Sequence, residues 1–224
     1  MFAARPEFGP SLPEVVASRL HLPAARVRAA ILGAAATVVV LYVAAGLLGV
    51  RGPAALRDQA VGGAAPFTLG HSDALRRVAP EEGELLRLEG RPGAPAQSYT
   101  AEPFALPAYR GDVTAALGVL AARQADELAR GLPDFRYRGD GKARINDLPG
   151  HLLVFQFRRD GATVYGKRFL LVPLVEPGAP APRRGVAVTL VAERSPAVPN
   201  ADAVGENSAL KAPLRSFRFG TERP

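Results

Sequence analysis

Leu152–Val172 reads LLVFQFRRDGATVYGKRFLLV, and this stretch decides the fold of the larger part of the chain. Two runs rich in aliphatic, β-branched and aromatic residues, Leu152–Phe157 and Thr163–Val172, flank the turn residues Arg159-Asp160-Gly161. An Asp-Gly pair between two such runs is typical of a tight β-hairpin. The sequence therefore predicts two long antiparallel strands here.

Further strands are expected on both sides of this hairpin. Val186–Glu193 (VAVTLVAE) alternates so that every second residue shares one face, which predicts a third long strand. Leu85–Glu89 and Ser98–Phe104 are separated by a Pro/Gly loop at Arg91–Pro95 and are predicted to pair as an antiparallel hairpin. Phe67–Leu69 is expected to be a first strand or its entrance.

The segments between and after these strands are less regular. Phe135–Arg138 is predicted to lead through the turn Gly139-Asp140-Gly141 into an extended segment at Lys142–Asn146. Ala201–Leu210 is predicted to contain a short helix. The sequence LRSFRFG that follows, residues 214–220, is expected to form an edge strand or to pack back on the sheet.

One amphipathic helix is predicted between the two groups of strands. Asp112 is a suitable N-cap, and Gly131 followed by Pro133 ends the helical pattern. Apolar residues fall at helical spacing between these limits, and the opposite face is charged. The predicted fold class is therefore α+β: a mostly antiparallel β-sheet domain with one main amphipathic helix packed on a face, preceded by a single N-terminal transmembrane helix.

This order of a hairpin, an amphipathic helix and a meander of long strands resembles the PsbP-like fold. Ile145-Asn146-Asp147-Leu148-Pro149-Gly150, which precedes the long hairpin, is similar to the motif that enters the central strands of that family. The resemblance covers roughly residues 67–220. It implies a binding or assembly module of a secreted or membrane-anchored bacterial protein, and it carries over no catalytic residue.

The transmembrane helix is predicted at Ala29–Val50, which contains 22 residues without a charge. As a helix this segment would be about 33 Å long, enough to cross the hydrocarbon core of a bilayer. It is longer than the apolar part of a cleaved signal peptide. Arg26 and Arg28 lie directly before it, so the positive-inside rule favours a cytoplasmic N-terminus.

These features predict four parts of the chain. A short cytoplasmic tail (1–28) is followed by the transmembrane helix (29–50), a Gly/Ala/Pro-rich linker (51–66) and an extracytoplasmic α+β domain (67–220). The predicted localisation is the cell membrane, with a single pass and the C-terminal domain outside. The lipid bilayer is accordingly one expected partner.

Composition argues against several classes of function. The chain carries 28 basic and 21 acidic residues, for a net charge of +7, but its arginines are spread thinly along the sequence. A surface that grips nucleic-acid phosphates would cluster its basic residues, so no nucleic-acid partner is expected. The absence of cysteine excludes disulfides, thiol nucleophiles and thiolate metal sites.

The sequence offers little that indicates catalysis. His71-Ser72-Asp73 brings three catalytic residue types together, but consecutive residues cannot form a triad, and a polar turn is expected. Glu81, Glu82 and Glu84 lack the spacing of a calcium loop. His151 opens a strand without a second histidine at metal-ligand spacing. No catalytic, cofactor-binding or metal-binding residue is therefore assigned, no cofactor is expected, and the protein is predicted not to be an enzyme.

Two hypotheses of function follow from this sequence. The first is a non-catalytic extracytoplasmic interaction or assembly module that binds a protein partner in the membrane or envelope. The alternative is a lipid- or small-molecule-binding domain, or a weak hydrolase, with a pocket between the helix and the sheet, because an apolar helix face above a sheet is a common place for pockets.

Overall fold

The computed structural model describes residues 37, 55–63, 65–175 and 180–221. The chain divides into two units, Met1–Pro53 and Ala54–Pro224. In the first unit only Thr37, which is helical, is described, so the predicted tail 1–28 and the rest of the predicted span 29–50 lie outside the described residues. None of the helices in the described part of the chain combines the length and the apolar character that crossing a bilayer requires.

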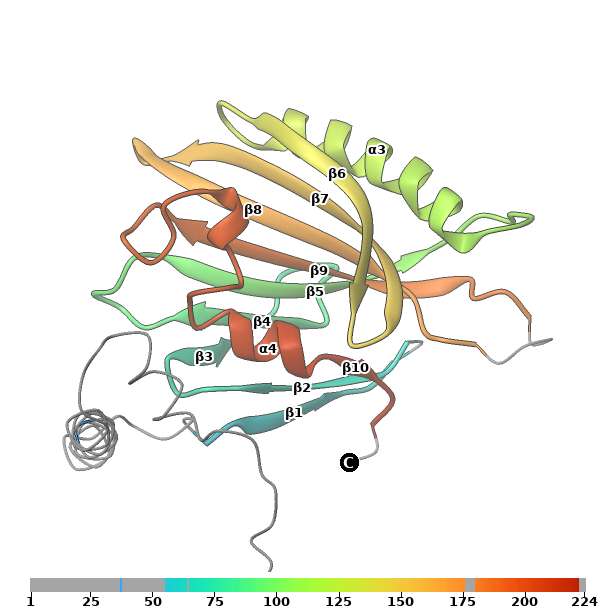
Figure 1. Ribbon diagram of the computed structural model, residues 1–224, viewed down its shortest axis with the longest axis horizontal. Helices are drawn as coiled ribbons and strands as arrows, with labels where there is room; N and C mark the ends of the chain where they lie inside the picture. Colours follow the sequence, from blue (N-terminus) through green and yellow to red (C-terminus); the bar gives the residue numbers. More distant parts are fainter. Residues whose placement is uncertain (1–36, 38–54, 64, 176–179, 222–224) are drawn as a thin grey trace, which may run out of the picture. The chain divides into compact units, whose positions relative to one another are not determined.

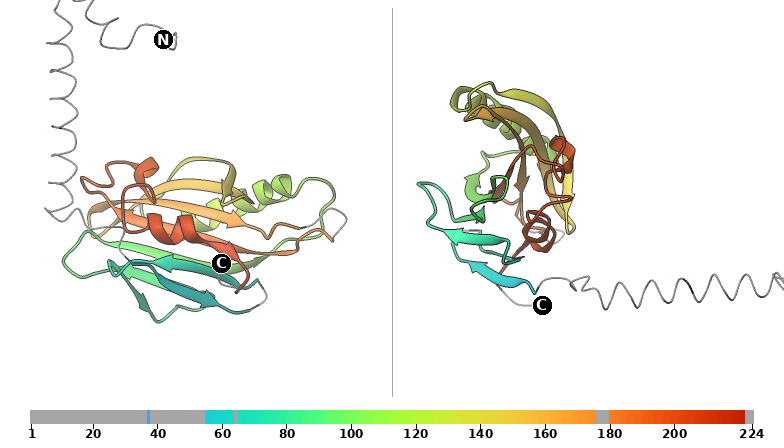
Figure 2. Two further views of the ribbon diagram at one scale, coloured as in Figure 1. Left: turned by 60° about the horizontal axis from the view of Figure 1, so that its bottom comes forward. Right: turned by 90° about the vertical axis from the view of Figure 1, so that its left-hand side faces the viewer.

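Seven strands of the second unit form one sheet in which every neighbouring pair is antiparallel (Figure 1). Figure 2 shows that this sheet is strongly curved. The spatial order of the strands is β3 (Leu75–Val78), β4 (Leu86–Gly90), β5 (Gln97–Ala105), β9 (Arg184–Glu193), β8 (Ala162–Leu171), β7 (Leu148–Arg159) and β6 (Arg136–Ile145). The α+β class with a mostly antiparallel sheet is confirmed.

The predicted helix is α3 (Val113–Gly131), which packs on β6 and β7 at one end of this sheet (Figure 1). Its N-cap is Asp112, whose side chain accepts a hydrogen bond from the backbone N–H of Thr114 at 2.9 Å. The helix ends where the backbone becomes extended at Leu132, just before Pro133. The predicted caps are therefore confirmed at both ends.

The long hairpins are joined by two-residue turns of the expected chemistry. Asp160 and Gly161, between β7 and β8, have φ values of 51° and 80°. Asn146 and Asp147, between β6 and β7, have φ values of 47° and 66°. Two successive positive φ angles match the right-handed twist of the flanking strands, and Asn, Asp and Gly tolerate them best.

The apolar core lies on both faces of the larger sheet because its strands alternate. Val186, Val188 and Leu190 of β9 point away from α3 into the larger cluster, whereas Ala187 packs on the helix side. The larger cluster is closed by buried residues of the smaller sheet and of the C-terminal segment: Val61, Phe67, Leu69, Val198, Val204, Leu210, Leu214 and Phe217.

The smaller sheet corrects the predicted linker. Its strand order is β1 (Arg57–Val61), β2 (Phe67–His71) and β10 (Arg218–Phe219). β1 lies within residues 51–66, which were expected to connect the membrane span to the domain without regular structure. β1 forms because it pairs with β2 along its whole length, from Arg57 opposite His71 to Val61 opposite Phe67.

Two local predictions are wrong. Gly139-Asp140-Gly141 is not a turn, because β6 runs through it and pairs with β7 on both sides of a bulge between Tyr137 and Gly139. Gly139 has a φ of 145°, which suits glycine, so the residue that indicated a turn forms the bulge instead.

In the C-terminal segment the expected helix at 201–210 is reduced to the 3-10 turn η1 (Ala201–Ala203). The helix α4 (Lys211–Ser216) comes later, because Pro213 and Leu214 are buried on one side of it. The edge strand predicted at the C-terminal end is confirmed as β10, which pairs with β2.

Candidate functional site

The polar residues singled out in the sequence do not assemble into one site. His71 is buried at the end of β2, and its ring Nδ1 lies 3.2 Å from the carbonyl oxygen of Ser72. Asp73 forms an ion pair with Arg57 at 2.7 Å instead of contacting this ring. His71 ends β2, and Ser72 and Asp73 lie in the expected polar turn between β2 and β3.

The acidic residues before β4 surround an arginine. The Arg87 guanidinium lies 2.7 Å from Glu84 and 2.8 Å from Glu81. Burial acts to raise the pKa of Glu84, but hydrogen bonds from Arg87 and from the Glu81 backbone outweigh it and lower the pKa. Among the described residues no three metal-ligating side chains come together, at this point or elsewhere.

A hydrogen-bonded array that the sequence reading missed lies on the helix side of β6 and β7. His151 Nε2 is 2.5 Å from Asp140 Oδ2, and the Tyr137 hydroxyl donates to the other oxygen of the same carboxylate. β6 and β7 bring these residues together, because Asp140 is paired with Leu153 and Lys142 with His151. The sequence predicted a turn at 139–141, and a turn would not have placed Asp140 opposite Leu153 in a strand pair.

The charges of this array depend on one another. Hydrogen bonds from Tyr137 and His151 lower the pKa of Asp140, and the neighbouring carboxylate raises the pKa of Tyr137. The other ring nitrogen, His151 Nδ1, is buried and has no hydrogen-bond partner among the described residues. His151 lies against α3 at Gly118, where a Cβ would be 3.4 Å from the ring carbon Cε1. The array can therefore orient Asp140 but offers no nucleophile to the histidine.

A pocket of about 290 Å³ adjoins this array, between α3 and β6. We call it the helix–sheet pocket. Its walls combine small alanine side chains of the helix with two aromatic rings and two carboxylates; the lining residues are Ala121, Ala122, Ala125, Asp126, Ala129, Phe135, Tyr137, Asp140 and Leu153. A cavity thus exists where the alternative hypothesis expected one.

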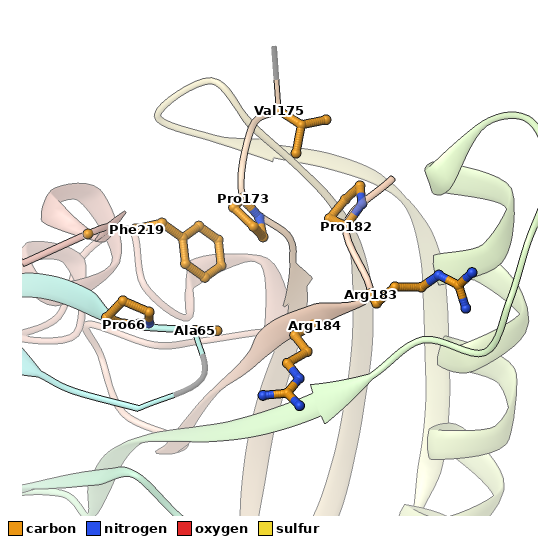
Figure 3. Close-up of a pocket in the computed structure, with 9 residues that line it drawn as sticks. Ala65, Pro66, Pro173, Val175, Pro182, Arg183, Arg184 and Phe219 are labelled. Carbon is orange, nitrogen blue, oxygen red and sulfur yellow. The ribbon is translucent and has the colours of Figure 1, made fainter. Parts of the chain in front are cut away.

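A larger and more apolar pocket, of about 480 Å³, lies where β8 ends and β9 begins, beside β10. We call it the end pocket. It is lined by Ala65, Pro66, Pro173, Val175, Pro182, Arg183, Arg184, Phe219 and Gly220. Figure 3 shows Pro173, Pro182 and Phe219 around this space, with the side chain of Arg183 directed away from Phe219.

The end pocket could not be found from sequence. Its lining comes from three separate parts of the chain: the approach to β2, the connection between β8 and β9, and the C-terminal strand. Only the pairing of β10 with β2 brings Phe219 to Phe67 and so to the other two parts. Of the prolines in this lining, Pro66 lies in the segment that the sequence predicted to be a linker.

Comparison with known proteins gives matches among solved structures alone. No protein-family profile matches the chain, and no curated protein matches it. LpqN of Mycobacterium tuberculosis, described as involved in cell envelope biogenesis, matches with a TM-score of 0.49 and 13% identity, over 75% of this chain and 99% of LpqN. The PsbP protein CyanoP of Synechocystis sp. PCC 6803 also has a TM-score of 0.49, with 10% identity, over 77% of this chain and 96% of CyanoP. A PsbP protein is thus among the solved structures that the chain is similar to, as the resemblance in the sequence led us to expect.

Proposed function

We propose that this protein is a membrane-anchored, non-catalytic interaction module whose end pocket receives a short apolar segment of a protein partner in the membrane or envelope. The end pocket carries the proposal, because a cavity of this size with mostly apolar walls is a site that an apolar ligand or side chain can fill. The anchor is the apolar segment 29–50, and the domain that follows it is placed outside the cell.

Exposed apolar side chains at the mouth of the end pocket support a protein partner. Leu174 is 70% exposed and Val175 is 41% exposed, although large aliphatic side chains are usually buried. Contiguous apolar surface of this kind marks interaction sites. Arg184 lines the same pocket without an ion-pair partner among the described residues, so it can bind a carboxylate or a carbonyl oxygen of the partner.

The chemistry of the Tyr137–Asp140–His151 array supports a non-catalytic role. A nucleophilic mechanism needs a hydroxyl, thiol or amine within hydrogen-bond reach of the histidine. In the described part of the chain the only side chain bonded to His151 is Asp140, and the free ring nitrogen is buried against α3. Asp140 is already held by two donors, which favours a positioning role for this group.

Site-specific photocrosslinking in native membranes tests the proposed partner. A photoreactive benzoylphenylalanine placed at Val175 should give a discrete protein adduct. The same group at Val119, which is 59% exposed on α3, is the matched control and should not give that adduct. Leu174→Asp in the chain labelled at Val175 should suppress it. Adducts with lipid alone, or equal adducts at the two positions, would contradict the proposal.

A membrane-impermeant thiol reagent tests the proposed anchor and topology. The chain has no cysteine, so a single cysteine introduced as Ser11→Cys or Thr221→Cys gives an unambiguous readout in whole cells. Labelling at position 221 alone is expected. Labelling at position 11 alone would reverse the topology and place the domain in the cytoplasm.

The helix–sheet pocket favours a second candidate function, the binding of a small molecule. Its aromatic and carboxylate groups, Tyr137, Asp126 and Asp140, suit a ligand with an apolar body and a donor or cationic group. Ala122→Phe should fill the pocket and abolish ligand-induced thermal stabilisation in a compound screen. Ala115→Phe, at an exposed alanine of α3 outside the pocket lining, should retain it. Equal responses in both variants would argue against this site.

A further inference from the structure

Part of the helix-side face of the larger sheet is not covered by α3. The helix packs on β6 and β7, at one end of the strand order, while β3, β4 and β5 lie at the other end (Figure 1). Residues directly opposite each other on neighbouring strands share a face. Arg76, Glu89 and Ser98 are paired in this way from β3 to β5, so they form a row across the uncovered part, and the next residue of the row, Val191 of β9, packs against the core cluster below α3.

A pocket of about 320 Å³ lies on this row, and we call it the arginine pocket. Four arginines but only one carboxylate line it: Arg76, Arg87, Arg91 and Arg159, with Glu89. Ser98 adds a hydroxyl group, and Val191 is an apolar residue of the lining. The excess of guanidinium groups gives the pocket a positive potential, which raises the local concentration of anions.

Two of the four arginines are already engaged with acidic side chains. Arg87 lies within 2.8 Å of both Glu84 and Glu81. Its hydrogen bond to Glu84 raises the pKa of the guanidinium, although burial acts to lower it. Arg76 lies 3.4 Å from Glu89. Because the charges of Arg76 and Arg87 are already paired with carboxylates, an added anion would bind mainly to the other two arginines.

Arg91 and Arg159 have no carboxylate partner among the described residues. Arg91 donates from Nε to the carbonyl oxygen of Asp73 at 2.6 Å, which orients its guanidinium and leaves the terminal nitrogens available. The Arg159 guanidinium lies over the Phe157 ring, 5.3 Å from its centroid. Each guanidinium is thus held by one neighbour and keeps donors for a ligand.

We propose that the arginine pocket binds phosphate esters. A phosphate group offers several oxygens and up to two negative charges, and its geometry matches the planar fork of arginine in bidentate hydrogen bonds. A single carboxylate would satisfy fewer of these donors. The phosphate ester can belong to the headgroup of an anionic lipid or to a soluble or polymeric phosphate, because both present the same chemistry to Arg91, Arg159 and Ser98. This site is separate from the end pocket, so it stands or falls independently of the protein partner.

The test compares two double variants of the full-length protein, held in phosphatidylcholine nanodiscs. Arg91→Gln/Arg159→Gln removes two exposed arginines of the pocket. The matched control, Arg110→Gln/Arg144→Gln, removes two exposed arginines that line no part of it. Because none of these four side chains pairs with a carboxylate in the described part of the chain, neither variant leaves a buried acid uncompensated. Thermal unfolding of both variants checks that the fold is retained.

Calorimetric titration with glycerol 3-phosphate is the first measurement. The pocket variant should bind at least about tenfold more weakly than the wild type, and the control variant should change by less than about threefold. Arg91→Lys/Arg159→Lys keeps both positive charges but lacks the planar pair of guanidinium N–H donors, so it should give an intermediate affinity. Equal losses in the pocket and control variants, or no binding of glycerol 3-phosphate by the wild type at millimolar concentrations, would overturn the proposal.

Vesicle flotation distinguishes the two sources of phosphate. Wild-type protein held in phosphatidylcholine nanodiscs, which already accommodate the proposed anchor, is mixed with vesicles of phosphatidylcholine, with or without phosphatidylglycerol. Binding that requires phosphatidylglycerol and is lost in the pocket variant alone assigns the site to a lipid headgroup. Binding of glycerol 3-phosphate without such vesicle binding assigns it to a soluble or polymeric phosphate. Vesicle binding that both variants lose equally indicates general charge attraction and counts against the pocket.

Discussion

Tyr99 is fully buried on the face of the larger sheet opposite α3, and its hydroxyl has no hydrogen-bond partner among the described residues. Burial alone raises the pKa of this hydroxyl. A buried polar group without a partner costs about 1–3 kcal/mol. Tyr99→Phe should therefore raise the free energy of unfolding by about 1 kcal/mol in urea denaturation. Tyr165→Phe, on the same face but in the lining of a surface pocket with Asn200 and Asp202, should give a smaller change. A clear loss of stability in Tyr99→Phe would show that the hydroxyl is paired.

Asp140 gives a prediction of pH dependence. Its pKa is lowered from the usual 3.8 by the Tyr137 hydroxyl and then by His151, so the folded protein releases this proton more readily than the unfolded chain. The resulting stabilisation is complete above the unfolded pKa and is lost as the pH falls through the folded pKa. Asp140→Asn should be less stable than the wild type at neutral pH, and this difference should shrink below about pH 4.

The measurement is the free energy of unfolding between about pH 2 and about pH 7 for the wild type and Asp140→Asn. Asp126→Asn is the control, because its carboxylate lies exposed in the same pocket lining without a side-chain hydrogen bond among the described residues. A stability difference for Asp140→Asn that stays constant down to the lowest pH would contradict the assigned role of the carboxylate.

Contacts between individual side chains were the feature of the molecule that the sequence predicted least well. Asp140 and His151 are 11 positions apart and become neighbours only through the register of β6 and β7. That register depends on a bulge at Gly139 that cannot be distinguished from a turn by residue type alone. The sequence showed an acidic group at Glu81, Glu82 and Glu84, but only the structure showed that Glu84 pairs with Arg87.

At the scale of elements, the close packing of the β7–β8 hairpin requires a glycine at one position of β8. Gly166 on β8 lies opposite Phe155, and a Cβ at this position would meet the Phe155 ring at 2.3 Å. Gly166→Ala must displace a buried ring in the core below α3, so it should lower the free energy of unfolding by about 1–3 kcal/mol. Chemical denaturation of the purified domain measures this loss.

Gly141→Ala is the matched control for Gly166→Ala. Gly141 also lies in a long strand, β6, and no atom is within 4 Å of a Cβ built there. Its replacement should be neutral or slightly stabilising, because alanine restricts the unfolded chain. Equal free energies of unfolding for Gly166→Ala and Gly141→Ala would contradict the close approach of the Phe155 ring to Gly166.

Elements were predicted well where their determinants are local. The caps of α3 and the Asp-Gly turn of the long hairpin lie within a few residues of what they control, so sequence was sufficient. The smaller sheet has no such local determinant. β2 depends on β10 at the other end of the chain, and Arg57–Val61 has no clear alternation, so β1 was interpreted as linker. Of the cavities, the helix–sheet pocket was expected, whereas the end pocket depends on that long-range pairing.

At the scale of the whole molecule, the second unit is predicted to need β1 for its full stability. In the described part of the chain β1 is the only strand that pairs with all five residues of β2, because β10 pairs with Thr68 and Phe67 alone. Val61 and Ala65 are also buried in the larger core cluster. Burial of a valine contributes about 1.5–3 kcal/mol, and each lost main-chain hydrogen bond removes about 0.5–1.5 kcal/mol more.

Two soluble fragments test this requirement directly. The fragment 55–221 keeps β1, whereas 66–221 lacks it and exposes the edge of β2. We expect both to contain the larger sheet by circular dichroism, but the shorter fragment should unfold at least several degrees lower, consistent with a loss of about 2 kcal/mol or more. Since the larger core cluster includes Phe67 and Phe217, the loss should also weaken the docking of the C-terminal segment and expose it to proteolysis. Equal melting temperatures would instead mean that residues 51–66 behave as the linker that their composition indicates, with β1 contributing nothing to the stability of the domain.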